Sequence, residues 1–99
     1  MAAIIWSNKS IDDLVELEAF AEKISTDYAP YLISKILEAE KQLARFPRSG
    51  RVVPELNLPT IRELLVNNYR LIYLLDDLQI VRIITIRHSA VPFDVFPLN

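Results

Sequence analysis

The sequence predicts an α+β domain. In this domain a short N-terminal strand and an antiparallel helical hairpin pack on a small antiparallel sheet, in the order β-α-α-β-β-β. Two apolar stripes with three- and four-residue steps occupy about residues 8–46. Three runs rich in apolar and β-branched residues follow over about 60–87. At 99 residues, the chain is expected to form one domain, 1–99, that ends in an extended tail over 88–99.

The first helix is expected to begin near two serines. Residues 3–6 (AIIW) are a short strand candidate that is expected to join the sheet. Ser7 or Ser10 can then cap a helix, and Ser10 with Asp13 three residues later fits a capping box. The apolar positions that predict an amphipathic helix to about residue 24 are Ile11, Leu14, Leu17, Ala21 and Ile24.

The second helix is expected after a short break. Residues 25–27 (STD) interrupt the first pattern and offer a new cap. Pro30 falls in the first turn, where a missing backbone N–H costs little. The second apolar stripe consists of Leu32, Ile33, Ile36, Leu37, Leu43 and Ala44. Pro47 ends the helix because it disfavours helical backbone at the residue before it. A connection of about three residues predicts an antiparallel hairpin.

The segment after the helices is expected to be irregular until about residue 60. Gly50 is the only glycine, so it is expected to adopt a backbone conformation closed to other residues. Pro54 and Pro59 disfavour regular strand pairing around them. Three strands are then predicted over 60–66, 69–75 and 79–86. Asn67 and Asn68 are expected to form the turn between the first two strands, since Asn tolerates positive φ.

Arg70 lies in the middle of an otherwise apolar strand and needs an explanation. A tight turn after Val66 would pair Leu65 with Arg70 and Glu63 with Ile72. Glu63 would then be the diagonal neighbour of Arg70 on one face of the sheet, within reach of its long side chain. The structural interpretation of Arg70 is therefore neutralisation by Glu63 at the surface of the sheet.

Arg62 and Tyr73 would face each other on the other side of the same hairpin. A guanidinium over a tyrosine ring is an ordinary cation–π pair, so this pair also has a structural interpretation. A functional interpretation needs further groups. Arg82 and Arg87 lie on and at the end of the last strand, and Arg48 and Arg51 flank Gly50 in the preceding loop.

Charge is distributed unevenly along the chain. Residues 1–44 contain all four lysines and eight acidic residues, whereas residues 45–99 contain all seven arginines and five acidic residues. Arginine is suited to a bidentate grip on carboxylate or phosphate, so the second part is a candidate working surface. The alternative is that lysine simply suits exposed helices and arginine suits strands, because such an asymmetry is only suggestive.

Several kinds of site and location are disfavoured by the composition. The chain has no cysteine and one histidine, so neither a disulfide framework nor a metal site is expected. No glycine-rich phosphate loop is present, and no cofactor is expected. The start of the chain lacks the features of a signal peptide, and no apolar run approaches the roughly 18 residues that span a bilayer. A cytoplasmic location without membrane contact is therefore expected.

His88 is the one candidate for acid–base chemistry at neutral pH. Its unperturbed pKa of about 6.5 would allow it to act as a general acid or base. A lone histidine is more often a hydrogen-bonded structural residue, and catalysis also requires a positioned partner within bonding reach. The residues alone leave both interpretations open.

The sequence resembles the RelE/ParE toxin superfamily across about residues 3–90. The segments that carry the resemblance are 6–7 (WS), 13–14 (DL), 47–55 (PRSGRVVPE), 61–64 (IREL), 69–73 (YRLIY) and 86–88 (IRH). The resemblance implies a helical hairpin on a small antiparallel sheet. It also implies a cognate antitoxin, whose acidic or amphipathic segment wraps the toxin. That segment is expected to bind the exposed apolar surface of the hairpin and sheet, either as a helix in a groove or as an added strand.

The resemblance favours the ParE-like branch, whose members inhibit DNA gyrase by binding. Residues 50–55 and 62–64 resemble that branch, as does the histidine at position 88. The alternative is a RelE-like endoribonuclease that cuts mRNA on the ribosome, with Arg70 clamping phosphate and His88 or Glu55 moving protons. Residues 89–92 (SAVP) offer neither the arginine nor the tyrosine expected of an enzyme. A second alternative is a degenerate, non-toxic member that retains only antitoxin binding.

The resemblance and the arginine pattern together assign a set of target- or partner-binding residues. They are Arg48, Arg51, Arg62, Arg70, Arg82, Arg87 and His88. In the favoured interpretation these residues serve binding or structure and none is catalytic. The sequence leaves the oligomeric state open between a homodimer and a hetero-oligomer with the antitoxin.

Overall fold

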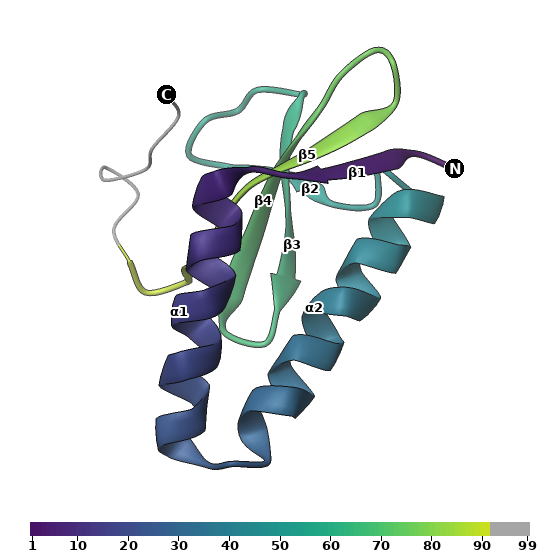
Figure 1. The fold of residues 1–99 in the computed structure, drawn as a ribbon. Coiled ribbons are helices and arrows are strands. Elements are labelled where there is room, and N and C mark those ends of the chain that lie inside the picture. The colour runs from purple at the N-terminus through teal and green to yellow at the C-terminus, as the bar shows by residue number, and fades with distance from the viewer. Residues whose placement is uncertain (92–99) are drawn as a thin grey trace.

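Residues 1–91, which the computed structural model describes, form two helices and five strands (Figure 1). The elements are β1 (Ala3–Trp6), α1 (Asn8–Ile24), α2 (Tyr28–Arg45), β2 (Arg51–Val52), β3 (Ile61–Val66), β4 (Tyr69–Leu75) and β5 (Ile80–His88). The α+β class and the predicted order of the elements are confirmed, with β2 as an additional short strand. The predicted tail begins inside β5, and its remainder, 92–99, lies outside the described residues.

The strands form one mixed sheet in the order β1-β5-β4-β3-β2. Three pairs are antiparallel, whereas β1 runs parallel to β5, with Ala3 opposite Ile80 and Trp6 opposite Ile83. The small sheet predicted as antiparallel is therefore mixed, and the first strand joins it as predicted. The helical hairpin carries the chain away from β1, and a crossover of this length permits the parallel pairing that a short hairpin cannot.

The β3–β4 hairpin has the predicted register. Leu65 lies opposite Arg70, and Glu63 lies opposite Ile72. Asn67 adopts a φ of 53°, as expected for an asparagine in a tight turn. Between β4 and β5 the register shifts by one residue, because Ile72 pairs with Thr85 and Tyr73 pairs with Ile83. This β-bulge leaves one extra residue in β5 and bends the strand locally.

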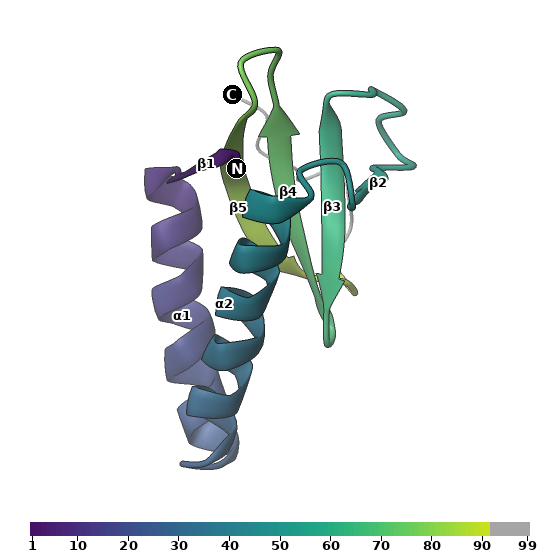
Figure 2. The same cartoon turned by 90° about the vertical axis from the view of Figure 1, so that its right-hand side faces the viewer.

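Both helices cover the same face of the sheet, and their hairpin end extends past the end of the sheet (Figure 2). The core on this face is made by buried residues of the helices and of the three long strands, among them Leu32, Ile36, Leu43, Leu71, Tyr73 and Ile83. A smaller cluster on the other face consists of Val53, Ile61 and Ile72, with Leu56, Leu74 and Ile84 packed against it. We call this second face the open face, because neither α1 nor α2 covers it.

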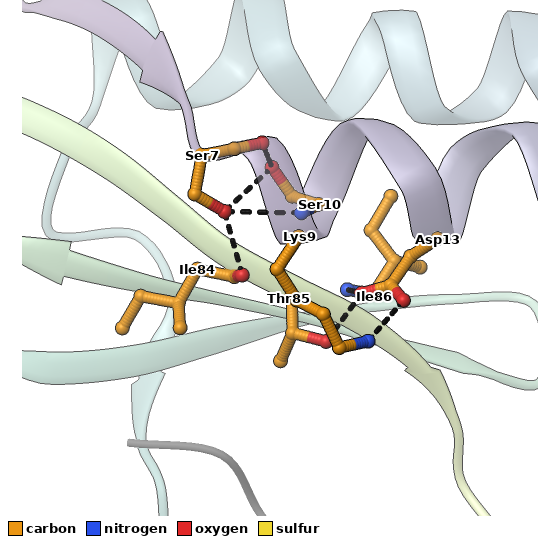
Figure 3. Close-up of polar contacts among 7 residues, drawn as sticks. All are labelled: Ser7, Lys9, Ser10, Asp13, Ile84, Thr85 and Ile86. Atoms are coloured by element: carbon orange, nitrogen blue, oxygen red, sulfur yellow. Dashed lines mark hydrogen bonds and ion pairs between the residues drawn. The ribbon is translucent and has the colours of Figure 1, made fainter. Parts of the chain in front are cut away.

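Two side chains near the start of α1 fix the helix to β5 (Figure 3). Ser7 is the N-cap: its side chain accepts a hydrogen bond from the backbone N–H of Ser10, and its hydroxyl donates to the Ile84 carbonyl over 2.8 Å. The predicted capping box of Ser10 and Asp13 is wrong. The Asp13 carboxylate instead accepts from the Thr85 hydroxyl at 2.5 Å and from the Ile86 N–H at 3.1 Å.

Gly50 is required for space and not for its backbone conformation. Among the described residues no glycine has a positive φ, so the predicted unusual conformation is wrong. A Cβ at this position would lie 2.5 Å from the Tyr73 hydroxyl oxygen and 2.7 Å from the Glu63 carbonyl oxygen. The Gly50 N–H donates to the same hydroxyl over 3.0 Å, and that hydroxyl donates to the Pro47 carbonyl over 2.8 Å. The close approach of the loop to Tyr73 therefore excludes a side chain.

Candidate functional site

Arg70 points onto the open face of the sheet, where two carboxylates hold its guanidinium. Nε donates to Glu63 Oε1 over 2.6 Å. Nη1 and Nη2 donate to the two carboxylate oxygens of Glu55 over 2.8 and 2.7 Å. Such bidentate, charge-assisted contacts are among the stronger hydrogen bonds in proteins. The predicted pairing of Arg70 with Glu63 is confirmed, and Glu55 is a second partner.

Glu63 joins Arg70 to another arginine at the edge of the sheet. Its side chain is fully buried, and Oε2 accepts from Nε and Nη2 of Arg51, each over 2.6 Å. The short β2 strand produces this contact because it places Arg51 directly opposite Glu63. Arg51, Glu63, Arg70 and Glu55 thus form a continuous chain of ion pairs, which we call the arginine network.

Glu55 reaches the network from the irregular segment between β2 and β3. Hydrogen bonds from Arg70 are the main cause that lowers the pKa of the Glu55 carboxyl to about 2, against an opposing effect of partial desolvation. The same contact is the main cause that raises the pKa of Arg70 above its usual value. Both groups are therefore charged throughout the physiological range.

The other arginines on the open face lie on β5. Arg87 lies directly opposite Arg70 in the register and is buried. Arg82 is exposed, and its Nε lies 3.8 Å from the Asp76 carboxylate. Together with the arginine network, these residues place four arginines on the open face: Arg51, Arg70, Arg82 and Arg87.

Arg62 and Arg48 lie beside the network but make different contacts. Arg62 donates to the carbonyls of Gly50 and Pro59 over 3.0 and 3.1 Å. The predicted cation–π pair with Tyr73 is not among the cation–π contacts of the described residues, which join Lys35 to Tyr31 and Arg45 to Phe46. That prediction is therefore wrong. Arg48 is an exposed residue of the loop before β2.

His88 faces the opposite side of the sheet from Arg70. It pairs with Tyr69 in the β4–β5 register, and the two rings meet edge-on with centroids 5.4 Å apart. Tyr69 packs against the core beneath the helices, and successive side chains of a strand alternate between faces. Of the three residues considered for catalysis, the structure brings together Arg70 and Glu55 but places His88 away from them.

Two grooves run along the flanks of the helices. The first, of about 470 Å³, lies between α1 and the end of β5 and is lined by apolar Leu17, Phe20, Tyr69 and Ile86 together with Lys9, Glu16 and His88. The second, of about 330 Å³, lies between α2 and β3 and is lined among others by Tyr31, Leu64 and Leu65. Large apolar side chains stay exposed nearby: Phe20, Ile24, Tyr31 and Leu65. Exposed apolar surface of this kind is typical of protein-binding faces.

The sequence interpretation missed two polar residues that organise these surfaces. Arg51 is predicted to bind a target or partner, and its pairing with Glu63 is an additional contact. That pairing depends on β2, and a strand of two residues is too short to show a periodic pattern in the sequence. Asp13 was assigned to a local cap, whereas its partners lie on β5, more than 70 residues away. Its position on the same side of α1 as Leu17 and Ala21 was the available signal.

No helix in the described part of the chain is both long and apolar enough to cross a membrane.

Two solved structures resemble this chain in fold. A structure described as the chromosomal ParDE TA system from P. aeruginosa superposes with a TM-score of 0.70 at 20% identity, covering 89% of this chain and 96% of that one. The toxin–antitoxin complex RelBE2 from Mycobacterium tuberculosis superposes with a TM-score of 0.58 at 21% identity, covering 88% and 96%. At these identities the likeness concerns the fold.

A search of curated protein sequences gave no match. A family model, by contrast, matches residues 4–92 and describes the ParE toxin of the type II toxin–antitoxin system parDE. The match spans nearly the whole chain and both surfaces described above. The protein therefore belongs to the ParE toxin family of type II toxin–antitoxin systems.

Proposed function

We propose that this ParE-family toxin inhibits DNA gyrase by binding it, without chemistry of its own, and that a cognate antitoxin neutralises it. The observation that carries the proposal is the arginine network. Both terminal nitrogens and Nε of Arg70 are engaged by carboxylates within the protein. An arginine used in this way supports a structural role better than the transient grip on a scissile phosphate that RNA cleavage requires.

The exposed arginines are the proposed contacts to the target. Arg51 and Arg82 are exposed on the open face, Arg48 is exposed in the loop before β2, and Arg62 is partly exposed. Arg70 and Arg87 are buried, so their proposed contribution is to support this surface. Because rim charges mainly set association rate and salt dependence, binding to the target is expected to weaken as ionic strength rises.

The antitoxin is proposed to cover the apolar surface at the flanks of the helices. The groove between α1 and β5 is lined by apolar Leu17, Phe20 and Ile86 and also by His88. Strand addition along β5 is disfavoured at Ile86, because the Asp13 carboxylate already accepts its N–H. This supports a helix-in-groove contact. The proposed location is the cytoplasm, where gyrase and the antitoxin are found, and the proposed assembly is a hetero-oligomer with the antitoxin.

The proposal is tested by adding the purified chain, freed of its antitoxin, to a supercoiling reaction of purified gyrase. Inhibition with accumulation of cleaved DNA is expected, and pre-incubation with the antitoxin should restore supercoiling. Full supercoiling at a large molar excess of the correctly folded chain would refute gyrase as the target.

A ribosome-dependent endoribonuclease remains the second candidate, because Glu55 and Arg70, two of the residues considered for catalysis, are in direct contact. The placement of His88 on the other face is the observation against it. Incubation with ribosomes carrying a defined mRNA separates the two candidates, since cut RNA is expected only for the enzyme.

A further inference from the structure

The imidazole of His88, the last residue of β5, is held by two contacts. Its ring meets the ring of Tyr69 edge-on, with centroids 5.4 Å apart. Its Nδ1 accepts a hydrogen bond from the backbone N–H of Ala90 over 3.1 Å. The turn after β5 keeps Ala90 close, because the Val91 N–H donates to the His88 carbonyl over 3.0 Å. Both the strand before it and the turn after it therefore fix the ring.

The bond from Ala90 determines which ring nitrogen carries the proton. A backbone N–H can only donate, so Nδ1 must offer its lone pair, and the neutral imidazole then carries its proton on Nε2. His88 is therefore a donor through Nε2–H. Within the part of the chain that the structure describes, no side chain or carbonyl accepts that proton.

The Nε2–H donor belongs to the groove between α1 and β5. His88 is an exposed residue that lines this groove, and Nε2 is the ring nitrogen farther from its own backbone. The walls beside it are apolar, formed among others by Leu17, Phe20 and Ile86. In a mostly apolar site, a few placed polar groups fix the orientation of whatever binds and provide the specificity.

The charges of the groove disfavour an anion as the acceptor. Among the described residues, charged side chains of both signs line it: Lys9, Arg87, Asp13 and Glu16. Lys9 is paired with Asp13, and Arg87 is buried, whereas Glu16 is exposed. A partner carboxylate would thus enter a groove that already presents one, and like charges across an interface are unfavourable.

We propose that His88 determines specificity in this groove by donating its Nε2–H to an uncharged side-chain oxygen of the partner helix, that of an amide or a hydroxyl. The inference rests on the proposal that the antitoxin binds here as a helix, and it names the polar contact which that helix makes. The acceptor is a side chain because the main-chain carbonyls of a helix already accept bonds within it. Ala90 is the positioning residue, since its N–H keeps the proton on Nε2.

Three substitutions of His88 separate the donor from the ring, with antitoxin affinity measured by calorimetry at about pH 8, where an ordinary imidazole is neutral. His88→Gln keeps an N–H near the position of Nε2. His88→Asn keeps a polar group only near Nδ1, and His88→Phe keeps a ring to pack on Tyr69. His88→Gln should bind about as tightly as the unchanged protein. His88→Asn and His88→Phe should bind roughly three- to tenfold more weakly, as expected for one lost neutral hydrogen bond.

The same titrations show which claim fails. Three variants that bind alike, whether tightly or weakly, would overturn the His88 contact while antitoxin binding itself stands. An unchanged protein that does not bind the antitoxin would refute the proposed neutralisation, and the contact with it. The ratio of affinities between His88→Gln and His88→Phe should be the same at low and high ionic strength. A ratio that collapses at high ionic strength would overturn the uncharged acceptor, because salt screens charge-assisted contacts.

The tautomer is tested on the free protein without any variant. His88 is the only histidine of the chain, so its ring signals in a long-range proton–nitrogen correlation spectrum are assigned without ambiguity. Nε2 should give the signal of a protonated nitrogen and Nδ1 that of an unprotonated one. The reverse pattern would overturn the proposal, whatever the affinities of the variants.

Discussion

Arg70 and Glu63 lie on neighbouring strands, with Arg70 Nε donating to Glu63 Oε1 over 2.6 Å on the face of the sheet away from the helices. The fully buried Glu63 carboxylate also binds Arg51, so one acid neutralises two bases from two different elements. This relationship explains why an apolar strand tolerates an arginine at its centre. The positions of Arg51 and Arg70 on the open face therefore both depend on Glu63.

Replacing Glu63 by alanine should destabilise the protein strongly. The change leaves the buried Arg70 with one carboxylate fewer and removes the side-chain contact of Glu63 with Arg51 on β2. Removal of one partner from a buried pair typically costs about 3–5 kcal/mol. Urea denaturation measures the loss as a lower midpoint. The exposed Glu38→Gln control should stay within about 0.5 kcal/mol of the original protein. A midpoint for Glu63→Ala equal to that of the control would show that the network contributes nothing to stability.

Acid should weaken the contact of Glu55 with Arg70 before it unfolds the protein as a whole. The pKa of Glu55 is lowered from 4.5 to about 2 in the folded state. Its ionised carboxylate therefore contributes stability that is fully present above about pH 4.5 and is lost as the pH falls from there toward 2. Because the side chain is partly exposed, the contribution is screened and should be about 1 kcal/mol or less.

The measurement for Glu55 is the free energy of unfolding at a series of pH values from 7 to 2, for the original protein and for Glu55→Gln. All other carboxylates are common to both, so the difference between the two curves isolates this group. The difference between the two proteins should be constant above about pH 4.5 and should shrink as the pH falls from there toward 2. A difference that does not change with pH would contradict the lowered pKa.

Gly50→Ala should destabilise the loop before β2. The new Cβ would meet the Tyr73 hydroxyl at 2.5 Å and the Glu63 carbonyl at 2.7 Å, so the backbone must move. Forcing extra atoms into a packed site typically costs about 1–3 kcal/mol. Thermal denaturation should show a lower Tm for Gly50→Ala than for Ser89→Ala, an exposed control. Adding Tyr73→Phe should recover part of the loss, since it removes one of the atoms in the way.

Asp13→Ala should loosen the contact between α1 and β5. It leaves the Ile86 N–H and the Thr85 hydroxyl without their buried acceptor, which typically costs about 1–3 kcal/mol. Amide hydrogen exchange at Ile86 should accelerate. The neighbouring Asp12 is exposed and offers a matched control, because Asp12→Ala removes the same charge from the same helix. Equal exchange rates at Ile86 in both variants would contradict the proposed anchor.

The local elements could be predicted because their causes lie close together in the chain. The helical hairpin is determined by the break at residues 25–27, by Pro30 and by the apolar stripe of α2. The Asn67 turn and the alternation of side chains fix the β3–β4 register, and with it the contact of Arg70 with Glu63. In each case the deciding contacts are separated by a few residues, so propensity and pattern agree with the final structure.

The features that the sequence did not predict depend on partners distant in the chain. The parallel pairing of β1 with β5 joins residues 77 positions apart. The role of Gly50 depends on Tyr73, and the role of Asp13 depends on β5. Glu55 meets Arg70 only because an irregular segment folds back over the sheet. Neither periodicity nor turn chemistry encodes such contacts.

The proposal that this toxin binds gyrase and does not cleave RNA is tested most directly by titrating the antitoxin-free chain. The titration is run in parallel on purified gyrase and on ribosomes that carry a defined mRNA. We expect supercoiling to be lost in proportion to the added chain while the mRNA stays intact. Cleaved mRNA together with undisturbed supercoiling would contradict it. In that case the contact between Glu55 and Arg70 would have to be reinterpreted as part of a catalytic centre.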